Sequence, residues 1–506
     1  MGDTAAIRSL PDAGDLPQAL AKEVAATPAR VTQERWTWFD TFDWRLHRKG
    51  LRLCAGADGR SKVLAADSGR LLGYLPGTPR FAEDLPASAL GERVAGALSV
   101  RALLPIVEVR LQRTAHERRD HRGKVVARLH RIAAAARAPG AEAWIELPHR
   151  LEIEALKGYA KAARVIARAA DGAGLTAAKE PLFLQALAVI GRWPGDYDSK
   201  IDVALDSDEP AGAAVRCILR GLLSALRANE NGTRAALDSE FLHDFRVAVR
   251  RIRSLLGQVK GALPAQATAR LQSEFAWLQQ LTGPARDLDV YLLHMPVYET
   301  SLPESERHNL APLRAFLERR RQSAYRQLIE GMDSARYAQL LAEAEALIAD
   351  DTPGPKGRDC VGRLANRRIH KIYRRVLAEG AAIGPDSPAA SLHELRKTCK
   401  KLRYLMEFFR SLYPRREIAE RLRTLKGLQE HLGDYQDLCV QAHALRAFSG
   451  EMAADGTAEP ETLLALGRLI ERLEQRAAHT RAEFAERFAR FARRKIRRRF
   501  ERLFGG

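Results

Sequence analysis

The sequence predicts a multidomain protein with an N-terminal α+β domain and a C-terminal all-α region made of two similar helical halves. Two observations support this fold class: the hydrophobic period changes near residue 210, and one helical motif occurs twice, 150 residues apart. At 506 residues the chain can bury more than one core. We expect a domain at residues 1–200, a linker at 201–214, and helical halves at 215–350 and 360–506.

The N-terminal region alternates aromatic or β-branched residues with polar ones, as half-buried strands do. These runs are RWTWFDTFDWRL from Arg35, RLLGYL from Arg70, LPIVEVRLQRT from Leu104, KVVARLH from Lys124 and AWIELPHRLEIEAL from Ala143. Helical patterns at 159–170 and 182–190 complete an α+β domain. The first thirty residues are rich in Ala, Pro and Gly, and we expect them to be poorly ordered.

Beyond residue 214 the sequence has the period of long amphipathic helices. The predicted helices of the first half are 215–227, 242–259, 269–281, 287–295, 310–332 and 336–348. The Pro- and Gly-containing segment from Asp351 to Asp359 divides the region, and counterparts of these helices follow from Arg363. Two copies of a helical bundle are the simplest architecture.

The repeated motif is a stripe of cations that begins with a histidine. It reads FLHDFRVAVRRIRSLL from Phe241 and SLHELRKTCKKLRYLM from Ser391. The cations follow each histidine at i+3, i+7 and i+10, so they fall in one sector of a helix. The two stripes are His243, Arg246, Arg250 and Arg253, and His393, Arg396, Lys400 and Arg403. Because like charges on neighbouring turns repel, we expect an anionic partner; a core histidine remains the alternative for either imidazole.

The repeat continues through LQQLTGPARDLDV from Leu278 and LQEHLGDYQDLCV from Leu428. Gly283 and Gly433 are expected to end helices, because glycine commonly occupies the left-handed position after a helix. Asp287 and Asp437 are expected to cap the next helices and to have a structural role.

Further cations extend the candidate site. Arg251 and Lys401 flank the stripes, and Lys397 has no basic counterpart at Val247. The spacing of other cations permits an inward face, with a solvated outer face as the alternative for each; they are Arg319, Arg320, Arg326, Arg367, Lys371 and Arg374.

The formal net charge of +19 favours a polyanionic partner: nucleic acid, an acidic membrane surface or a phosphate polymer. Residues 211–506 hold 51 of the 82 Lys and Arg residues but only 36 of the 63 acidic residues. The excess charge therefore lies mainly in the helical region.

Five scattered cysteines without a CxxC pair argue against a disulfide framework and a zinc finger. We see no secretory signal and no apolar run of 18 residues, and we expect a cytoplasmic protein without a transmembrane segment.

The C-terminal 300 residues resemble the CHAD domain, the conserved-histidine α-helical domain. The resemblance rests on LHDFRVAVRRIRSLL and LHELRKTCKKLRYLMEFF and on the Gly-x-x-x-Asp segment that follows each. It implies two helical bundles related by a pseudo-twofold axis, a basic groove or pore that binds inorganic polyphosphate, and association with polyphosphate granules.

The N-terminal region is similar to a CYTH domain, the triphosphate-tunnel antiparallel barrel. The similar segments are TWFDTFDWRLHRKGLRL, LPIVEVRLQR and WIELPHRLEIEALKG. The resemblance leaves Arg110, Arg113, Glu152 and Glu154 as phosphate or metal contacts. However, active members of the family begin with a strand that carries two alternating glutamates and a lysine, and AKEVAATPARVTQE offers nothing of that form. We therefore expect a degenerate CYTH-like domain, with no catalytic residues, metal site or cofactor.

Two rival functions stay open. A nucleic-acid-binding protein would place aromatic residues within the cationic stripes for base stacking, and these stripes contain none. A metal-dependent triphosphatase in the N-terminal domain would need the missing glutamates. Polyphosphate without a specific nucleic acid is the expected partner, and the sequence leaves the oligomeric state open.

Overall fold

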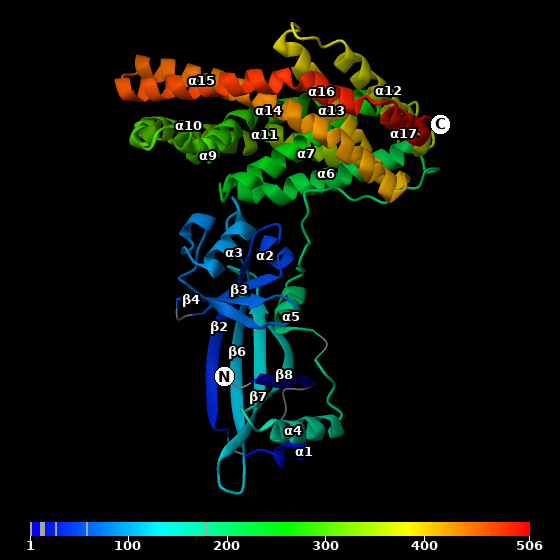
Figure 1. The fold of residues 1–506 in the computed structure, drawn as a ribbon. Helices are drawn as coiled ribbons and strands as arrows, with labels where there is room; N and C mark the ends of the chain where they lie inside the picture. The colour runs from blue at the N-terminus through cyan, green and yellow to red at the C-terminus, as the bar shows by residue number, and fades with distance from the viewer. Residues whose placement is uncertain (1–2, 11–15, 26–27, 57–58, 179, 506) are drawn as a thin grey trace. The chain divides into compact units, whose positions relative to one another are not determined.

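The fold was obtained as a computed structural model, which describes residues 3–10, 16–25, 28–56, 59–178 and 180–505 (Figure 1). The chain forms two units, Met1–Asp198 and Ser199–Gly506. The first unit is α+β and the second is helical, as the sequence predicted. Each unit is described separately.

The first unit is built on an antiparallel sheet. Its strands are β1 (Asp3–Leu10), β2 (Arg30–Asp40), β3 (Leu51–Gly56), β4 (Arg60–Ala65), β5 (Leu71–Pro76), β6 (Leu104–Arg119), β7 (Val125–Arg137) and β8 (Ile145–Ala155). They are ordered β1-β8-β7-β6-β2-β3-β4-β5. Within the described part of this unit, the outer strands β1 and β5 do not pair with each other, so the sheet is open and not a closed barrel.

Five helices are described in the same unit: α1 (Gln18–Ala21), α2 (Arg45–Arg48), α3 (Ala89–Leu98), α4 (Ala160–Gly172) and α5 (Leu182–Val189). The helices α4 and α5 confirm the two predicted from the sequence. Ile166 of α4 and Phe183 of α5 are buried in separate clusters against the sheet. Burial of these apolar faces holds the helices on the strands.

The prediction of poor order was wrong for residues 3–10. This segment is strand β1, whose Ile7 lies opposite Glu152 of β8. Backbone hydrogen bonding to β8 outweighs the weak strand propensity of an Ala-rich segment. The observed first strand, DTAAIRSL, contains no glutamate.

The second unit is helical. Its first half contains α6 (Ala211–Arg234), α7 (Ser239–Gln258), α8 (Ala265–Leu281), α9 (Gly283–Thr300), α10 (Ala311–Met332) and α11 (Ala335–Ala349). Its second half contains α12 (Val361–Ala381), α13 (Ala389–Phe408), α14 (Arg415–Ala454), α15 (Pro460–Ala482), α16 (Phe484–Phe491) and α17 (Arg494–Phe504). Both halves share one continuous apolar core. None of the helices in the described residues is long and apolar enough to span a membrane.

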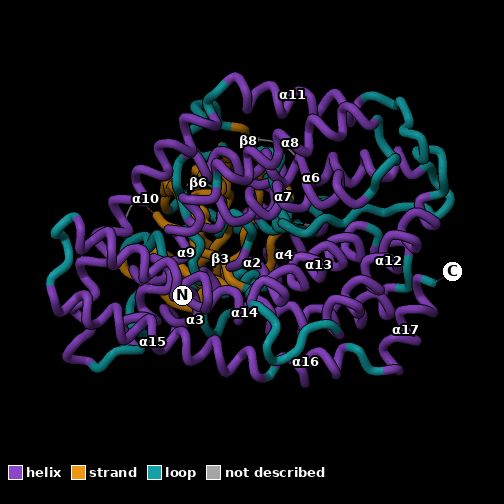
Figure 2. The backbone as a smooth tube through the Cα atoms, turned by 90° about the horizontal axis from the view of Figure 1, so that it is seen from above, coloured by secondary structure: helices purple, strands orange, loops and turns teal. Residues whose placement is uncertain are grey.

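The 150-residue repeat is visible in the helices themselves. The helices α7 and α13 each have 20 residues and begin 150 residues apart. The long helix α14 has 40 residues and corresponds to α8 and α9 together. The helices α7 and α13 contact each other in the middle of the unit (Figure 2).

The predicted positions of the repeated Gly and Asp residues at helix ends were wrong. Gly433 and Asp437 lie inside α14, and Gly283 begins α9 instead of ending α8. Thr282 stays in the right-handed helical region with φ −80° and ψ −7°, so the chain passes from α8 to α9 without a left-handed residue. Burial of Leu428, Leu432 and Leu438 keeps α14 continuous through its glycine, which costs only about 1 kcal/mol in a helix.

Candidate functional site

The helices α7 and α13 are fixed by their apolar faces. Phe245 and Ile252 of α7 and Leu395 and Leu402 of α13 are fully buried in the core. The Asp238 side chain caps α7 by accepting hydrogen bonds from the backbone N–H groups of the residues two and three positions later. Because the backbone is held in this way, the two stripes have defined directions, and every stripe residue is half-buried.

Two arginines of the α7 stripe are hydrogen-bonded to neutral oxygens. Arg246 donates to the Gln279 carbonyl at 3.0 Å and to the Thr282 hydroxyl at 2.7 Å, and Arg253 donates to the Gln279 amide oxygen at 2.5 Å. Burial, opposed in part by the charge of Asp287 and assisted by the charges of Arg250 and Arg286, lowers the pKa of Arg246 to about 10. Neutral acceptors orient these cations without cancelling their charge.

The stripe of α13 converges on that of α7. His393 shares a 3.0 Å hydrogen bond with the Gln436 side chain, and Arg396 lies 3.4 Å from Asp437. Burial lowers the pKa of Lys400 to about 8, and the charges of Arg396 and Arg250 add to this effect. Since Arg250 belongs to α7 and Lys400 to α13, the two stripes come close enough to repel each other.

Arg250 and Lys400 form the least neutralised part of the site. In the described residues, neither cation has a carboxylate within the 4.0 Å of an ion pair. The Nε atom of Arg250 is buried without a hydrogen-bond partner. The charge of Asp437 acts on Lys400 from beyond ion-pair distance and offsets the other effects only in part. An added anion would therefore stabilise the two cations.

A carboxylate neutralises one end of the stripes. Glu407 of α13 accepts from Arg251 at 3.2 Å and lies 3.4 Å from Arg403. Arg251 also donates to the Ser199 carbonyl at 2.7 Å. These two arginines are therefore partly committed to internal contacts that hold α7 against α13.

The repeated glycines bring the stripe arginines close to a helix backbone. A Cβ atom at Gly283 would lie 3.7 Å from Arg246, and a Cβ atom at Gly433 would lie 3.8 Å from Arg396. The repeat thus conserves a contact between an arginine and a glycine in both halves. Sequence spacing does not reveal this role or the parts played by Gln279, Thr282, Gln436 and Glu407, because Arg246, Arg253, His393 and Arg251 meet these residues across separate helices.

The other predicted cations lie at several places. Lys397 is exposed and pairs with Glu394 at 2.8 Å, and Lys401 is half-buried beside the α13 stripe. Arg319 and Arg320 line a cavity beside α10, where Arg320 pairs with Glu451. The remaining four are exposed: Arg326 on α10, and Arg367, Lys371 and Arg374 on α12. The structure does not bring these last four cations to the contact of α7 with α13.

The charged residues of the sheet pair with one another. Arg110 lies 2.6 Å from Glu146, and Arg113 lies 2.8 Å from Glu152. The register between β6 and β7 is continuous from Arg110 to Arg113, so these side chains point to opposite faces of the sheet. Within the described ranges, no group of three or more His, Cys, Asp or Glu residues could hold a metal ion.

Comparison with known proteins adds a family to this geometry. The family model of the CHAD domain matches residues 217–446. Two uncharacterized proteins of Mycobacterium tuberculosis, one from strain CDC 1551 and one from strain H37Rv, are each 27% identical over 223 residues, which is 43% of this chain. The matched region spans 42% of the length of these relatives.

Two solved structures are similar in part. The crystal structure of the CHAD domain from the plant Ricinus communis is 25% identical, covers 61% of this chain and 98% of its own, and has a TM-score of 0.47. PptA from Streptomyces chartreusis is 18% identical, with 55% and 99% covered and a TM-score of 0.45.

CHAD domains are linked to polyphosphate binding in general. The open antiparallel sheet of the first unit is compatible with a CYTH-like domain. On the match of the family model, residues 217–446 of the protein form a CHAD domain.

Proposed function

We propose that the protein binds inorganic polyphosphate where the stripes of α7 and α13 meet. The observation that supports this most directly is the juxtaposition of Arg250 and Lys400 without a carboxylate partner in the part of the chain that the structure describes. A chain of phosphates would supply the missing charge to both helices at once. Arg246 and Arg396 would extend the contact along the stripes, with the two histidines as further donors.

The chemistry of the stripes favours a ligand made only of phosphate. Phe245 is fully buried and Tyr404 is 6% exposed, so neither ring offers a face on which a base could stack. Guanidinium and ammonium groups recognise phosphate oxygens through charge-assisted hydrogen bonds. A binder of this kind gains affinity from many modest contacts along a multivalent chain.

The proposed role is binding without catalysis, with association to polyphosphate granules. Arg110 and Arg113 of the sheet are already paired with glutamates, and strand β1 lacks the glutamates of an active triphosphate tunnel. A metal-dependent triphosphatase is the alternative function. Phosphate release from tripolyphosphate in the presence of magnesium or manganese would favour that alternative.

The test is competition between long-chain polyphosphate and nucleic acids for the purified protein at physiological salt. The wild type is compared with a variant in which His243, Arg246, His393 and Arg396 are replaced by alanine. We expect polyphosphate to displace single- and double-stranded nucleic acid from the wild type, and the variant to lose this preference. Equal competition by nucleic acid, with unchanged binding by the variant, would contradict the proposal.

A further inference from the structure

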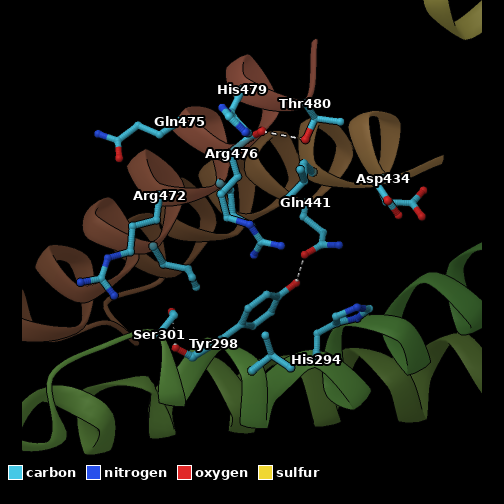
Figure 3. Close-up of a pocket in the computed structure, with 15 residues that line it drawn as sticks. His294, Tyr298, Ser301, Asp434, Gln441, Arg472, Gln475, Arg476, His479 and Thr480 are labelled. Carbon is cyan, nitrogen blue, oxygen red and sulfur yellow. Dashed lines mark hydrogen bonds between the residues drawn. The ribbon is translucent and has the colours of Figure 1, made fainter. Parts of the chain in front are cut away.

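Two cavities of the helical unit are related by the 150-residue repeat. One, of about 750 Å³, lies between α9, α14 and α15 and is called the α15 pocket (Figure 3). The other, of about 630 Å³, lies between α9, α10 and α14 and is called the α10 pocket. Tyr298 and Ser301 of the α15 pocket stand 150 positions before Phe448 and Glu451 of the α10 pocket. The two cavities therefore occupy equivalent places in the two halves of the repeat.

In the α10 pocket, a glutamate neutralises one of the two lining arginines, Arg319 and Arg320. Its Arg320 forms an ion pair with Glu451. Its Phe448 packs against Tyr291 and Phe316, with ring centroids 5.3 and 5.7 Å apart. The charge and the apolar surface of this cavity are thus largely used in internal contacts.

The α15 pocket has a different lining at the equivalent positions. Ser301 stands at the position equivalent to Glu451. The Tyr298 hydroxyl donates a hydrogen bond to the Gln441 side chain at 2.9 Å. Arg472 and Arg476 lie one turn apart on α15 and are exposed. Neither has an ion-pair partner among the described residues. Figure 3 shows the Arg476 side chain reaching toward Tyr298 and Gln441.

Acidic residues also lie at the α15 pocket, but one of them is already matched. Asp434 and Asp437 both line the pocket and are exposed, and Asp437 lies 3.4 Å from Arg396 of the α13 stripe. His294 also lines the pocket and donates a 2.7 Å hydrogen bond through Nδ1 to the carbonyl of Val290. The contact of Asp437 with Arg396 also shows that the pocket adjoins the stripe.

We infer that the α15 pocket is a second anion site, which binds a short run of phosphates through Arg472 and Arg476. The inference rests on the proposed function for its ligand class. The ligand is either a free oligophosphate or the segment of a long chain that leaves the stripe beside Asp437. The α10 pocket should bind phosphate more weakly, because Glu451 pairs with Arg320 and leaves Arg319 as the only lining arginine without an ion-pair partner among the described residues.

The experiment measures tripolyphosphate binding by calorimetry in a stripe variant, Arg250→Ala with Lys400→Ala, so that binding at the pocket is observed by itself. Addition of Arg472→Ala and Arg476→Ala should weaken the remaining binding by about tenfold, since two charge-assisted contacts are lost. The control adds Arg415→Ala and Arg416→Ala, which removes two exposed cations of α14 that lie outside the pocket, and should change binding by less than about twofold.

Equal losses in the pocket variant and the control would overturn the inference, because net charge alone would then explain binding. Unchanged binding in the pocket variant would overturn it too. Long-chain polyphosphate is titrated in parallel with the same proteins and the wild type. A loss in the pocket variant shows that the pocket holds a segment of the long chain, whereas a loss for tripolyphosphate alone identifies free oligophosphate as the ligand. Wild-type affinity of the stripe variant for the long chain would contradict the proposed function separately.

Discussion

The sheet and the helical unit use their arginines differently. In the sheet, Arg110 and Arg113 lie within 2.8 Å of glutamates. In the helical unit, Arg250 and Lys400 lie near each other, and the described residues supply no carboxylate within ion-pair distance of either. If the proposed function holds, the difference teaches that a basic residue contributes to anion binding when the fold leaves its charge without an ion-pair partner. A count of cations does not make that distinction.

Composition explains part of this difference. Residues 1–210 contain 31 Lys and Arg residues against 27 Asp and Glu residues, so most cations of the sheet can find a partner. Residues 211–506 contain 51 against 36, so the helical unit must leave cations unpaired. Where those unpaired cations gather is decided by the packing of α7 against α13.

The largest expected effect comes from removing the unmatched charge. Replacement of Arg246, Arg250, Arg396 and Lys400 by glutamine should weaken polyphosphate binding at least about a hundredfold, because each charge-assisted contact contributes about 1.5 kcal/mol or more. The salt dependence of binding should also become shallower, because fewer counterions are released. Titrations at several salt concentrations measure both effects. Unchanged affinity with an unchanged slope would place the binding surface elsewhere.

A pH titration sharpens the comparison at one residue. Burial, together with the charges of Arg396 and Arg250, lowers the pKa of Lys400 to about 8. A bound polyanion favours the charged amine, so affinity should be greatest below pH 8 and should fall by about tenfold between pH 7 and pH 9. Lys400→Arg keeps its charge over this range and serves as the control. A wild type that is as insensitive to pH as this variant would show that Lys400 does not contact the ligand.

The low pKa of Lys400 also predicts that the stability of the fold depends on pH. The pKa of Lys400 is about 8 in the folded protein and close to its ordinary value of 10.5 in the unfolded chain. The charged Lys400 therefore destabilises the fold below about pH 8. Between these two values the unfolded chain binds more protons, so this destabilisation should be relieved progressively as pH rises from about 8 to about 10.5. The difference in free energy of unfolding between the wild type and Lys400→Met measures the effect. A difference that stays constant over this range would contradict it.

A smaller effect is expected when one pocket is converted toward the other. Glu451→Ser copies Ser301 into the α10 pocket and frees Arg320 from its ion pair. Tripolyphosphate affinity or stoichiometry should rise by about twofold, which is the scale of one partly exposed cation. Calorimetry against Glu451→Asp, which keeps the charge, checks this result. Identical binding by both variants would show that the ion pair does not explain the difference between the pockets.

The smallest effect on binding is expected at the repeated glycine. Gly433 lies inside α14, and an added Cβ would make an ordinary contact with Arg396 at 3.8 Å. Gly433→Ala should therefore raise the free energy of unfolding by about 1 kcal/mol, because alanine favours the helix. Polyphosphate affinity should change less than about twofold. Denaturation and binding measurements on the same protein test both statements, and a loss of stability would show that the arginine needs the open space.

The sequence predicted the helices and the two stripes because both follow from local periodicity. Spacing alone places His393, Arg396 and Lys400 on one face, whatever the rest of the fold does. Local spacing could not predict that Arg250 would lie near Lys400, since this depends on how two helices that are distant in the sequence pack. The positions of the glycines and aspartates at helix ends were mistaken for a similar reason: burial of leucines on both sides of Gly433 outweighed its weak helix propensity.

The most direct test compares two double variants that each remove two cations. Arg250→Ala with Lys400→Ala removes unmatched charge from the stripes, and Arg110→Ala with Arg113→Ala removes matched charge from the sheet. Affinity for long-chain polyphosphate is measured at one ionic strength, after circular dichroism has shown that both variants are folded. We predict a loss of at least about tenfold for the stripe variant and less than about twofold for the sheet variant. Equal losses in the two variants would contradict the central claim that unmatched charge on α7 and α13 forms the binding site.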